Sequence, residues 1–310
     1  MAPSPSGRMH LGNVFAFLIA WADALQNSGN LILRVDDLDD RCKKPEVLEA
    51  LIADLKWLGL DWDGDAIYQS ERIDVYKDAW RELEKVAEVY PCFCSRADLH
   101  SASAPHASDG TPIYDGKCRA LTTEQIAELK EQKPPATRIA VPDSEITAHD
   151  YFYGDVTANL KTECGDMIMK RSDGVFSYQF TNAVDDALLG VNRIVRGNDL
   201  LSSAPREVWL ISELAKVISD INTEDIEFVH LPMLVNVNGQ RLAKRDHSLD
   251  LGEIQKTGAT PEHVIGKISH LIGLTEKFEL ISAQEFQAEF SLEQLRSKTQ
   301  FEVPANLFAA

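Results

Sequence analysis

Residues 2–13 read APSPSGRMHLGN, and this stretch decides the fold of the chain. A turn rich in proline and glycine carries His10 and leads into apolar residues at helical spacing. These predict a helix over residues 14–26 that Gly29 ends. His10 and several free backbone N–H groups would then lie at a helix N-terminus, where the helix dipole favours an anion. A lone histidine in a turn is usually structural, but this setting predicts a site for a triphosphate.

A second stretch, RLAKR at residues 241–245, follows a loop of sequence NGQ at residues 238–240. Adjacent basic residues most often face solvent. Lys244 and Arg245 can instead provide a cationic second half for the phosphate site, because hydrogen bonds from charged donors to phosphate are strong. The two stretches together predict a nucleotide-binding site.

Strands and helices alternate outward from the first stretch. Residues 31–35 predict a buried parallel strand that leads into an acidic turn. Helices of the same domain are predicted at 45–58, 70–89 and 203–218, and the pattern of this domain resumes with residues 178–186 and 193–196. This alternation is typical of a doubly wound parallel α/β sheet of the Rossmann type.

The alternation breaks at Pro91, which predicts three parts in the chain. The α/β catalytic domain would be split between residues 1–90 and 167–235. Residues 91–166 would form an inserted module, and residues 236–310 the loop of the second stretch with a short helical C-terminal connector.

Capping residues mark three further helix starts. Thr122 and Gln125, like Ser282 and Glu285, have the spacing of a capping box. Thr260 before a proline is an N-cap with Pro at the first helical turn.

The inserted module contains a cluster of potential metal ligands, Cys92-x-Cys94 followed by Tyr114-x-x-x-Cys118. Three thiolates and a phenolate are a possible ligand set for one structural Zn²⁺ ion in tetrahedral geometry. The alternative is a set of buried free thiols. The odd number of cysteines favours a reducing compartment and a metal site over a disulfide framework. We expect the other two, Cys42 and Cys164, to be ordinary thiols.

Composition narrows the class of protein. The 310 residues are 44% hydrophobic and 26% charged, as in ordinary globular proteins. The sequence has no apolar run of 18 residues and no N-terminal signal sequence, so we expect a cytoplasmic protein without membrane contact. A net charge of −18 argues against loose, sequence-independent nucleic-acid binding and leaves room only for a local basic face.

The stretches at residues 2–13 and 241–245, in this order and spacing, resemble the HIGH and KMSKS signatures of class I aminoacyl-tRNA synthetases. The APSPSG start is similar to the glutamyl branch, as is HLP at residues 230–232; Ala243 replaces the usual serine. The resemblance implies ATP with Mg²⁺ and makes His10 and Lys244 catalytic. It implies ATP-binding residues His10, Gly12, Asn13, Lys244 and Arg245.

The same resemblance implies a site for L-glutamate, formed by Ala2, Pro3, Ser4, Asp36, Tyr178 and Arg196. Asp36 replaces the glutamate of the family's R-I-E-D segment and is one methylene shorter, so its contact with the substrate amino group would be longer or water-bridged. Arg196 would hold the γ-carboxylate bidentately and reject glutamine, whose amide matches it poorly.

Only 66 residues follow Lys244, so we expect no large anticodon-binding region. A short core with the CxC…YxxxC element resembles the glutamyl-queuosine tRNA(Asp) synthetases. This implies a monomer that activates glutamate with ATP in the absence of tRNA and transfers it to queuosine in the anticodon of tRNA(Asp). Family members carry a strand and a glutamate-binding arginine before the Ala2 position, so we expect the natural chain to begin upstream of Met1.

Three other functions are compatible with these residues. A minimal or truncated glutamyl-tRNA synthetase would charge the tRNA 3′ end. A general nucleotidylyltransferase would share the phosphate site without depending on Tyr178 and Arg196. A catalytically impaired RNA-binding relic would keep the zinc module without turnover.

Overall fold

The computed structural model describes residues 1–5, 7–42, 44–99, 113–219, 221, 226–240, 242 and 249–308. The chain forms two compact units. The first comprises Met1–Glu71, Val195–Asp199 and Val229–Ala310, and the second Arg72–Ile194 and Leu200–Phe228. The predicted division into a split catalytic domain, an inserted module and a connector stays a prediction, since compactness is a different criterion.

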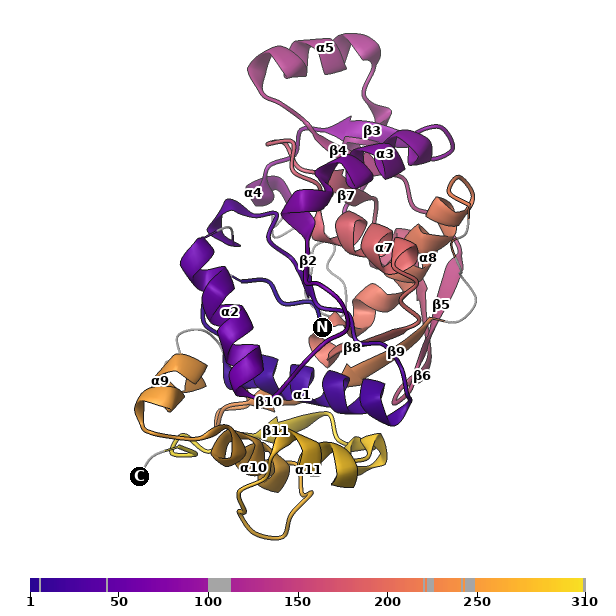
Figure 1. Cartoon of the computed structure of the whole chain (residues 1–310). Helices are drawn as coiled ribbons and strands as arrows, with labels where there is room; N and C mark the ends of the chain where they lie inside the picture. Colours follow the sequence, from indigo (N-terminus) through magenta and orange to yellow (C-terminus); the bar gives the residue numbers. More distant parts are fainter. Residues whose placement is uncertain are drawn as a thin grey trace. The chain divides into compact units, whose positions relative to one another are not determined.

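The first unit combines helices with short parallel strands. In Figure 1, α1 lies beside β10 and the yellow helix α11, both of which it contacts. The elements of this unit are α1 (Leu11–Gln26), β1 (Arg34–Val35), α2 (Pro45–Trp57), β2 (Ile67–Tyr68), β10 (Met233–Val235), α9 (Leu251–Lys256), α10 (Pro261–Leu271), α11 (Ala283–Glu289) and β11 (Gln300–Glu302).

Parallel pairing organises the first unit around β1. This strand pairs in parallel with β2, as β10 does with β11. On the other side of β1, the Arg34 N–H donates to Met1 O and the Asp36 N–H to Pro3 O, both at 2.9 Å. The predicted α/β class with parallel strands is confirmed, although the pairing in the described residues is divided among four small sheets.

The first helix follows its apolar pattern. Its buried face includes Phe15, which packs edge-on against Phe301 with ring centroids 6.3 Å apart. The helix ends at Gln26, and Ser28 rather than Gly29 takes the left-handed conformation, with φ of 52°. Gly29 closes the turn by donating its N–H to Ala24 O at 2.8 Å.

The second unit contains an antiparallel sheet, part of a mixed sheet and several helices. Its elements are α3 (Ile73–Leu83), β3 (Val89–Cys92), α4 (Arg96–Leu99), α5 (Thr123–Gln132), β4 (Ala136–Ile139), β5 (Glu145–Asp150), β6 (Gly154–Asn159), α6 (Leu160–Glu163), β7 (Met167–Lys170), α7 (Tyr178–Leu188) and α8 (Ala204–Ala215). Two strands, β8 (Arg193–Gly197) and β9 (Glu227–Leu231), begin in this unit and end in the first.

The sheets of the second unit differ in direction. The order β3-β4-β7 is antiparallel throughout, and β6-β5-β9-β8 is mixed, because β5 pairs antiparallel with β6 and parallel with β9. Helices α7 and α8 contact each other, and α8 also packs on β5. In the described part of the chain, no helix is long and apolar enough to cross a membrane.

One predicted helix is shorter than expected. Residues 70–89 were predicted as one helix, but α3 covers only Ile73–Leu83. Its start is delayed because the Asp37 carboxylate accepts the N–H and the O–H of Ser70, at 2.8 and 2.6 Å, and this holds Ser70 in a 3-10 turn. Its end is set by β3, which begins at Val89.

Candidate functional site

His10 is the N-cap of α1. Its ring Nδ1 accepts the N–H of Gly12 at 3.1 Å, and its own N–H donates to Asn13 Oδ1 at 3.2 Å, which completes a capping box. An imidazole whose Nδ1 accepts a hydrogen bond carries its proton, when neutral, on Nε2. The cap therefore orients His10 as a hydrogen-bond donor through Nε2.

The prediction of several free backbone N–H groups at this helix end was wrong. The Gly12 N–H goes to the His10 ring, and the N–H groups of Asn13 and Val14 donate to His10 O at 2.8 and 3.2 Å. The N-cap side chain accepts one of these N–H groups, and the backbone of the first turn accepts the other two. Gly12 and Asn13 thus shape the position of His10.

The segment that follows the predicted basic loop lies beside His10. Asp250 forms an antiparallel bridge with His10, and the Leu251 N–H donates to Met9 O at 2.8 Å. Upstream of the loop, Leu242 is buried and donates its N–H to Leu234 O at 3.3 Å. The predicted catalytic residue Lys244, with Arg245, lies outside the described residues.

An ion pair fixes the turn that carries His10. The Arg8 guanidinium donates to both carboxylate oxygens of Asp54 on α2, at 3.0 and 2.5 Å, and to Gln255 Oε1 on α9 at 2.9 Å. Burial raises the pKa of Asp54, and the opposing effect of Arg8 does not cancel it. The buried carboxylate therefore depends on Arg8 for its charged state.

The residues of the N-terminal stretch that are predicted to bind glutamate lie beside Asp36. The Pro3 carbonyl accepts the Asp36 N–H, so Ala2 and Ser4, both exposed, flank this contact. The Asp36 carboxylate accepts a hydrogen bond from Arg34 Nε at 2.8 Å, and both side chains are buried. Sequence reasoning missed this partner, which offsets part of the charge offered to a substrate amino group.

Arg196 has a buried partner that was also missed. Its Nε donates to Nε2 of His230 at 3.0 Å, and His230 is fully buried in β9. The accepting Nε2 places the proton of a neutral His230 on Nδ1. Tyr178 belongs to the second unit, where it is the first residue of α7 and is 47% exposed.

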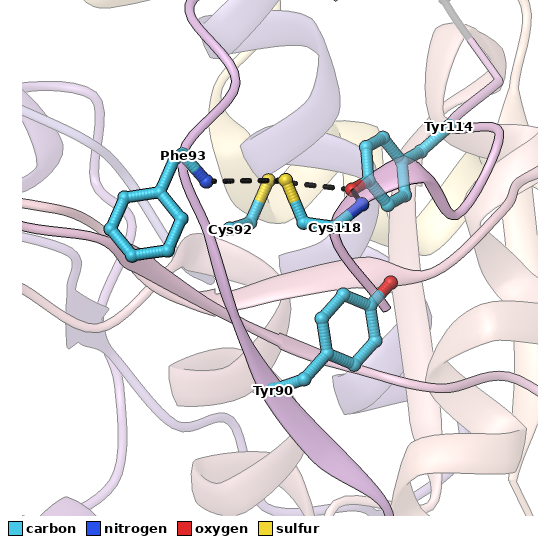
Figure 2. Packing of buried hydrophobic residues seen from close by; sticks show 5 residues of the cluster. All are labelled: Tyr90, Cys92, Phe93, Tyr114 and Cys118. Atoms are coloured by element: carbon cyan, nitrogen blue, oxygen red, sulfur yellow. Dashed lines mark hydrogen bonds between the residues drawn. The ribbon is translucent and has the colours of Figure 1, made fainter. Parts of the chain in front are cut away.

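The four predicted metal ligands of the second unit do come together. The sulfurs of Cys92, Cys94 and Cys118 lie within 4.8 Å of one another, and those of Cys94 and Cys118 are 3.6 Å apart. The Tyr114 hydroxyl is 3.7 Å from Cys92 Sγ, and Figure 2 shows it beside the two drawn sulfurs. Two sulfurs on one tetrahedral zinc ion would be about 3.8 Å apart, given a Zn–S distance of about 2.3 Å.

The backbone holds Tyr114 in this place. The Cys118 N–H donates to its hydroxyl oxygen at 2.8 Å, and the Phe93 N–H points to Cys118 Sγ at 3.4 Å (Figure 2). Tyr114 also forms a parallel bridge with Gly165, where φ is +70° and a side chain would collide with the Tyr114 backbone.

The surroundings of the cluster shift the pKa values of its thiols in different directions. Burial and the neighbouring thiols raise the pKa of Cys94 to about 12. Burial also acts to raise the pKa of Cys92, but Arg138 and the Cys94 backbone N–H outweigh it and the net shift is downward. None of the five cysteines, all within the described ranges, forms a disulfide. The cluster has the geometry and the chemistry to hold a metal ion.

Comparison with known proteins identifies the family of the chain. The family model described as tRNA synthetases class I (E and Q), catalytic domain, matches residues 1–307. The glutamyl-Q tRNA(Asp) synthetases of Symbiobacterium thermophilum and Nitratidesulfovibrio vulgaris are 40% and 39% identical; the alignments cover 100% and 90% of this chain and 96% and 87% of those proteins.

A solved structure has the same fold over nearly the whole chain. It is a glutamate tRNA ligase from Elizabethkingia meningosepticum in complex with its amino acid, 25% identical, with a TM-score of 0.77 over 99% of this chain and 67% of that one. With a family match over almost all of its residues, the chain belongs to the class I tRNA synthetases for glutamate and glutamine.

Proposed function

We propose that this enzyme uses ATP and Mg²⁺ to convert L-glutamate to glutamyl-adenylate and then transfers the glutamyl group to queuosine in the anticodon of tRNA(Asp). The observation that carries this proposal is the 40% identity, over the whole chain, to a glutamyl-Q tRNA(Asp) synthetase. The capped His10 and Arg196, which is hydrogen-bonded to buried His230, give the proposal its residues in this chain.

The first step is adenylate formation. An oxygen of the glutamate α-carboxylate attacks the α-phosphorus of ATP, and pyrophosphate leaves. His10 would donate through Nε2 to the phosphate oxygens on which charge develops, and Lys244 with Arg245 would bind the leaving pyrophosphate. Such a reaction needs positioning and charge stabilisation rather than a covalent enzyme intermediate.

Recognition of glutamate would involve both of its ends. Asp36 would bind the amino group beside the Ala2–Ser4 backbone, and Arg196 the γ-carboxylate, with Tyr178 as a further contact. In the second step, a hydroxyl of the queuosine cyclopentenediol attacks the acyl carbon and AMP leaves. The product is an ester on the modified base.

The thiol cluster would bind one structural Zn²⁺ ion through Cys92, Cys94, Tyr114 and Cys118. The ion would supply a cross-link between β3 and the segment around Cys118, not a catalytic function. Elemental analysis of protein purified without chelators should give one zinc per chain, and Cys94→Ser should lose it. A wild-type protein without zinc contradicts this assignment.

Two assays test the enzymatic proposal. ATP–pyrophosphate exchange should depend on glutamate, not on glutamine, and should proceed without tRNA. Radiolabelled glutamate should then label queuosine-containing tRNA(Asp), but not the same tRNA lacking queuosine. Absence of exchange would favour an RNA-binding relic, and exchange independent of glutamate a nucleotidylyltransferase.

The site of transfer can be located with a shortened tRNA. Removing the 3′-terminal adenosine abolishes charging of the 3′ end but leaves the anticodon intact, so labelling of tRNA(Asp) should persist. Efficient labelling of unmodified tRNA(Glu) that is lost with its 3′-terminal adenosine overturns the proposal in favour of a glutamyl-tRNA synthetase. We further propose that the enzyme acts as a monomer, which light scattering of the active fraction can test.

A further inference from the structure

A buried guanidinium lies against the thiol cluster. Arg138, in the central strand β4 of the antiparallel sheet, is 4% exposed. Its guanidinium carbon lies 3.6 Å from the centroid of the Tyr114 ring, so the cation is stacked on the ring face. An arginine stacked on an aromatic ring out of contact with water fixes the orientation of that ring.

The countercharge of Arg138 is missing. One terminal nitrogen donates to the backbone oxygen of Asp166, and Nε, which is also buried, has no hydrogen-bond partner among the described residues. No described carboxylate lies within ion-pair distance of this guanidinium. The Asp166 carboxylate instead accepts from the Tyr90 hydroxyl and from the Val141 N–H, at 2.5 and 2.9 Å. A buried arginine without an anionic partner is costly.

The thiol cluster supplies that countercharge once it holds a metal. Three thiolates around a divalent cation are net negative whether or not the Tyr114 hydroxyl has lost its proton. The cluster faces Arg138 through the Tyr114 ring, on which the guanidinium is stacked. The metal-loaded cluster therefore complements Arg138 in both charge and geometry.

We infer that Arg138 is a positioning residue of the metal site, which orients Tyr114 toward the ion and offsets the negative charge of the metal–thiolate cluster. This inference rests on the proposed metal site. It makes metal affinity depend on a residue that offers no ligand atom, as is usual for groups that contact metal ligands.

Metal release tests the inference. Wild type, Arg138→Met and Arg138→Lys are loaded with Zn²⁺ and mixed with a chromogenic chelator. Methionine removes the charge and the planar stack, so release should be about 10–100-fold faster. Lysine keeps a charge but loses the stack, so its release should lie between the two. Arg171→Met is the matched control, since Arg171 in the same unit pairs with Asp173 at the surface and should release zinc like wild type.

A second readout follows the geometry of the ligands. In the Co²⁺-loaded protein, the visible bands of tetrahedral cobalt should shift or weaken in both Arg138 variants if Tyr114 loses its position. The rise in Tm on adding zinc should also be smaller in Arg138→Met than in wild type. A structural role unrelated to the metal would lower the Tm of the loaded and metal-free proteins equally.

The outcomes are separable. Folded Arg138→Met that releases zinc at the wild-type rate overturns the inference while leaving the zinc site intact. If Arg138→Met does not fold, Arg138→Lys tests the inference. Zinc release from Arg138→Lys at the wild-type rate, together with an unchanged cobalt spectrum, then overturns it. Wild-type protein that binds no metal at all instead removes the proposed site on which the inference rests.

Discussion

Arg196, near the end of β8, donates its Nε–H to Nε2 of His230, near the end of the neighbouring strand β9, at 3.0 Å. Because Arg196 is always charged, it holds His230 in the tautomer that accepts. The histidine in turn restricts the guanidinium to one orientation. A residue proposed to bind the substrate γ-carboxylate is thus itself positioned by a buried imidazole.

We expect His230→Met to reduce kcat/KM for glutamate by about tenfold or more, since a hydrogen bond to a charged group contributes about 1.5–3 kcal/mol. The loss should appear in the KM for glutamate in ATP–pyrophosphate exchange, with the KM for ATP little changed. His230→Gln keeps an acceptor near the place of Nε2 and should recover most of the activity. Equal loss in both variants, or equal loss for ATP, would show that His230 only packs.

Gly12 leaves room for the His10 ring. A Cβ at position 12 would lie 3.0 Å from Cε1 and 3.1 Å from Nδ1 of His10, so Gly12→Ala should displace the ring. Alanine is the better helix former by about 1 kcal/mol. We therefore expect an unchanged or higher Tm together with a raised KM for ATP.

His10→Asn is the control for that experiment. Asparagine is a good N-cap, so the Tm should be kept while adenylate formation is lost with the imidazole. If Gly12→Ala and His10→Asn both retain wild-type exchange rates, His10 has no part in ATP binding.

Arg8 should make stability depend on pH through Asp54. Burial raises the folded-state pKa of Asp54 above its usual value, and Arg8 opposes that shift. A carboxyl with a raised pKa favours the fold in its protonated form, and this contribution is lost as pH rises through the folded-state pKa. Arg8→Met should therefore cost about 1 kcal/mol at pH 7 and less near pH 4, as measured by urea unfolding.

The double variant Arg8→Met/Asp54→Asn provides the check. Replacing the buried carboxylate by a neutral amide of similar shape should remove most of the added pH dependence. A loss in Arg8→Met that is the same at pH 4 and pH 7 would mean that Arg8 contributes by packing alone.

Chelation should loosen one part of the second unit selectively. Metal removal deprives β3 and the segment around Cys118 of their common anchor, so amide hydrogen exchange in β3 and β4 should accelerate. The amides of α1 belong to the first unit and should exchange at the same rate with and without chelator. Uniform acceleration throughout the chain would instead indicate global destabilisation.

Local features of this chain were predictable from sequence. The caps at Thr122, Thr260 and Ser282 all have the predicted hydrogen bonds, because a cap is decided by residues three or four positions apart. The CxC…YxxxC spacing likewise indicated four side chains that do come together, with Cys92 at the end of β3 and Cys118 in a short 3-10 turn.

Long-range polar pairs were not predictable in the same way. His230 was noticed only within the HLP segment, and nothing in its sequence neighbourhood pointed to Arg196, 34 residues away. Nothing in the sequence around Arg138 singled it out. A strand's sequence gives its faces but not its neighbours, so the partner of a buried charge becomes visible only when the register is known.

The metal site also depends on the absence of a side chain at Gly165. The backbone of Tyr114 passes so close to it that any side chain at position 165 would push the tyrosine away from the three sulfurs. In a saturation screen scored on zinc content, position 165 should therefore tolerate substitution as poorly as the cysteines. A search for ligand atoms would pass over this residue, although the position of the Tyr114 ligand depends on it.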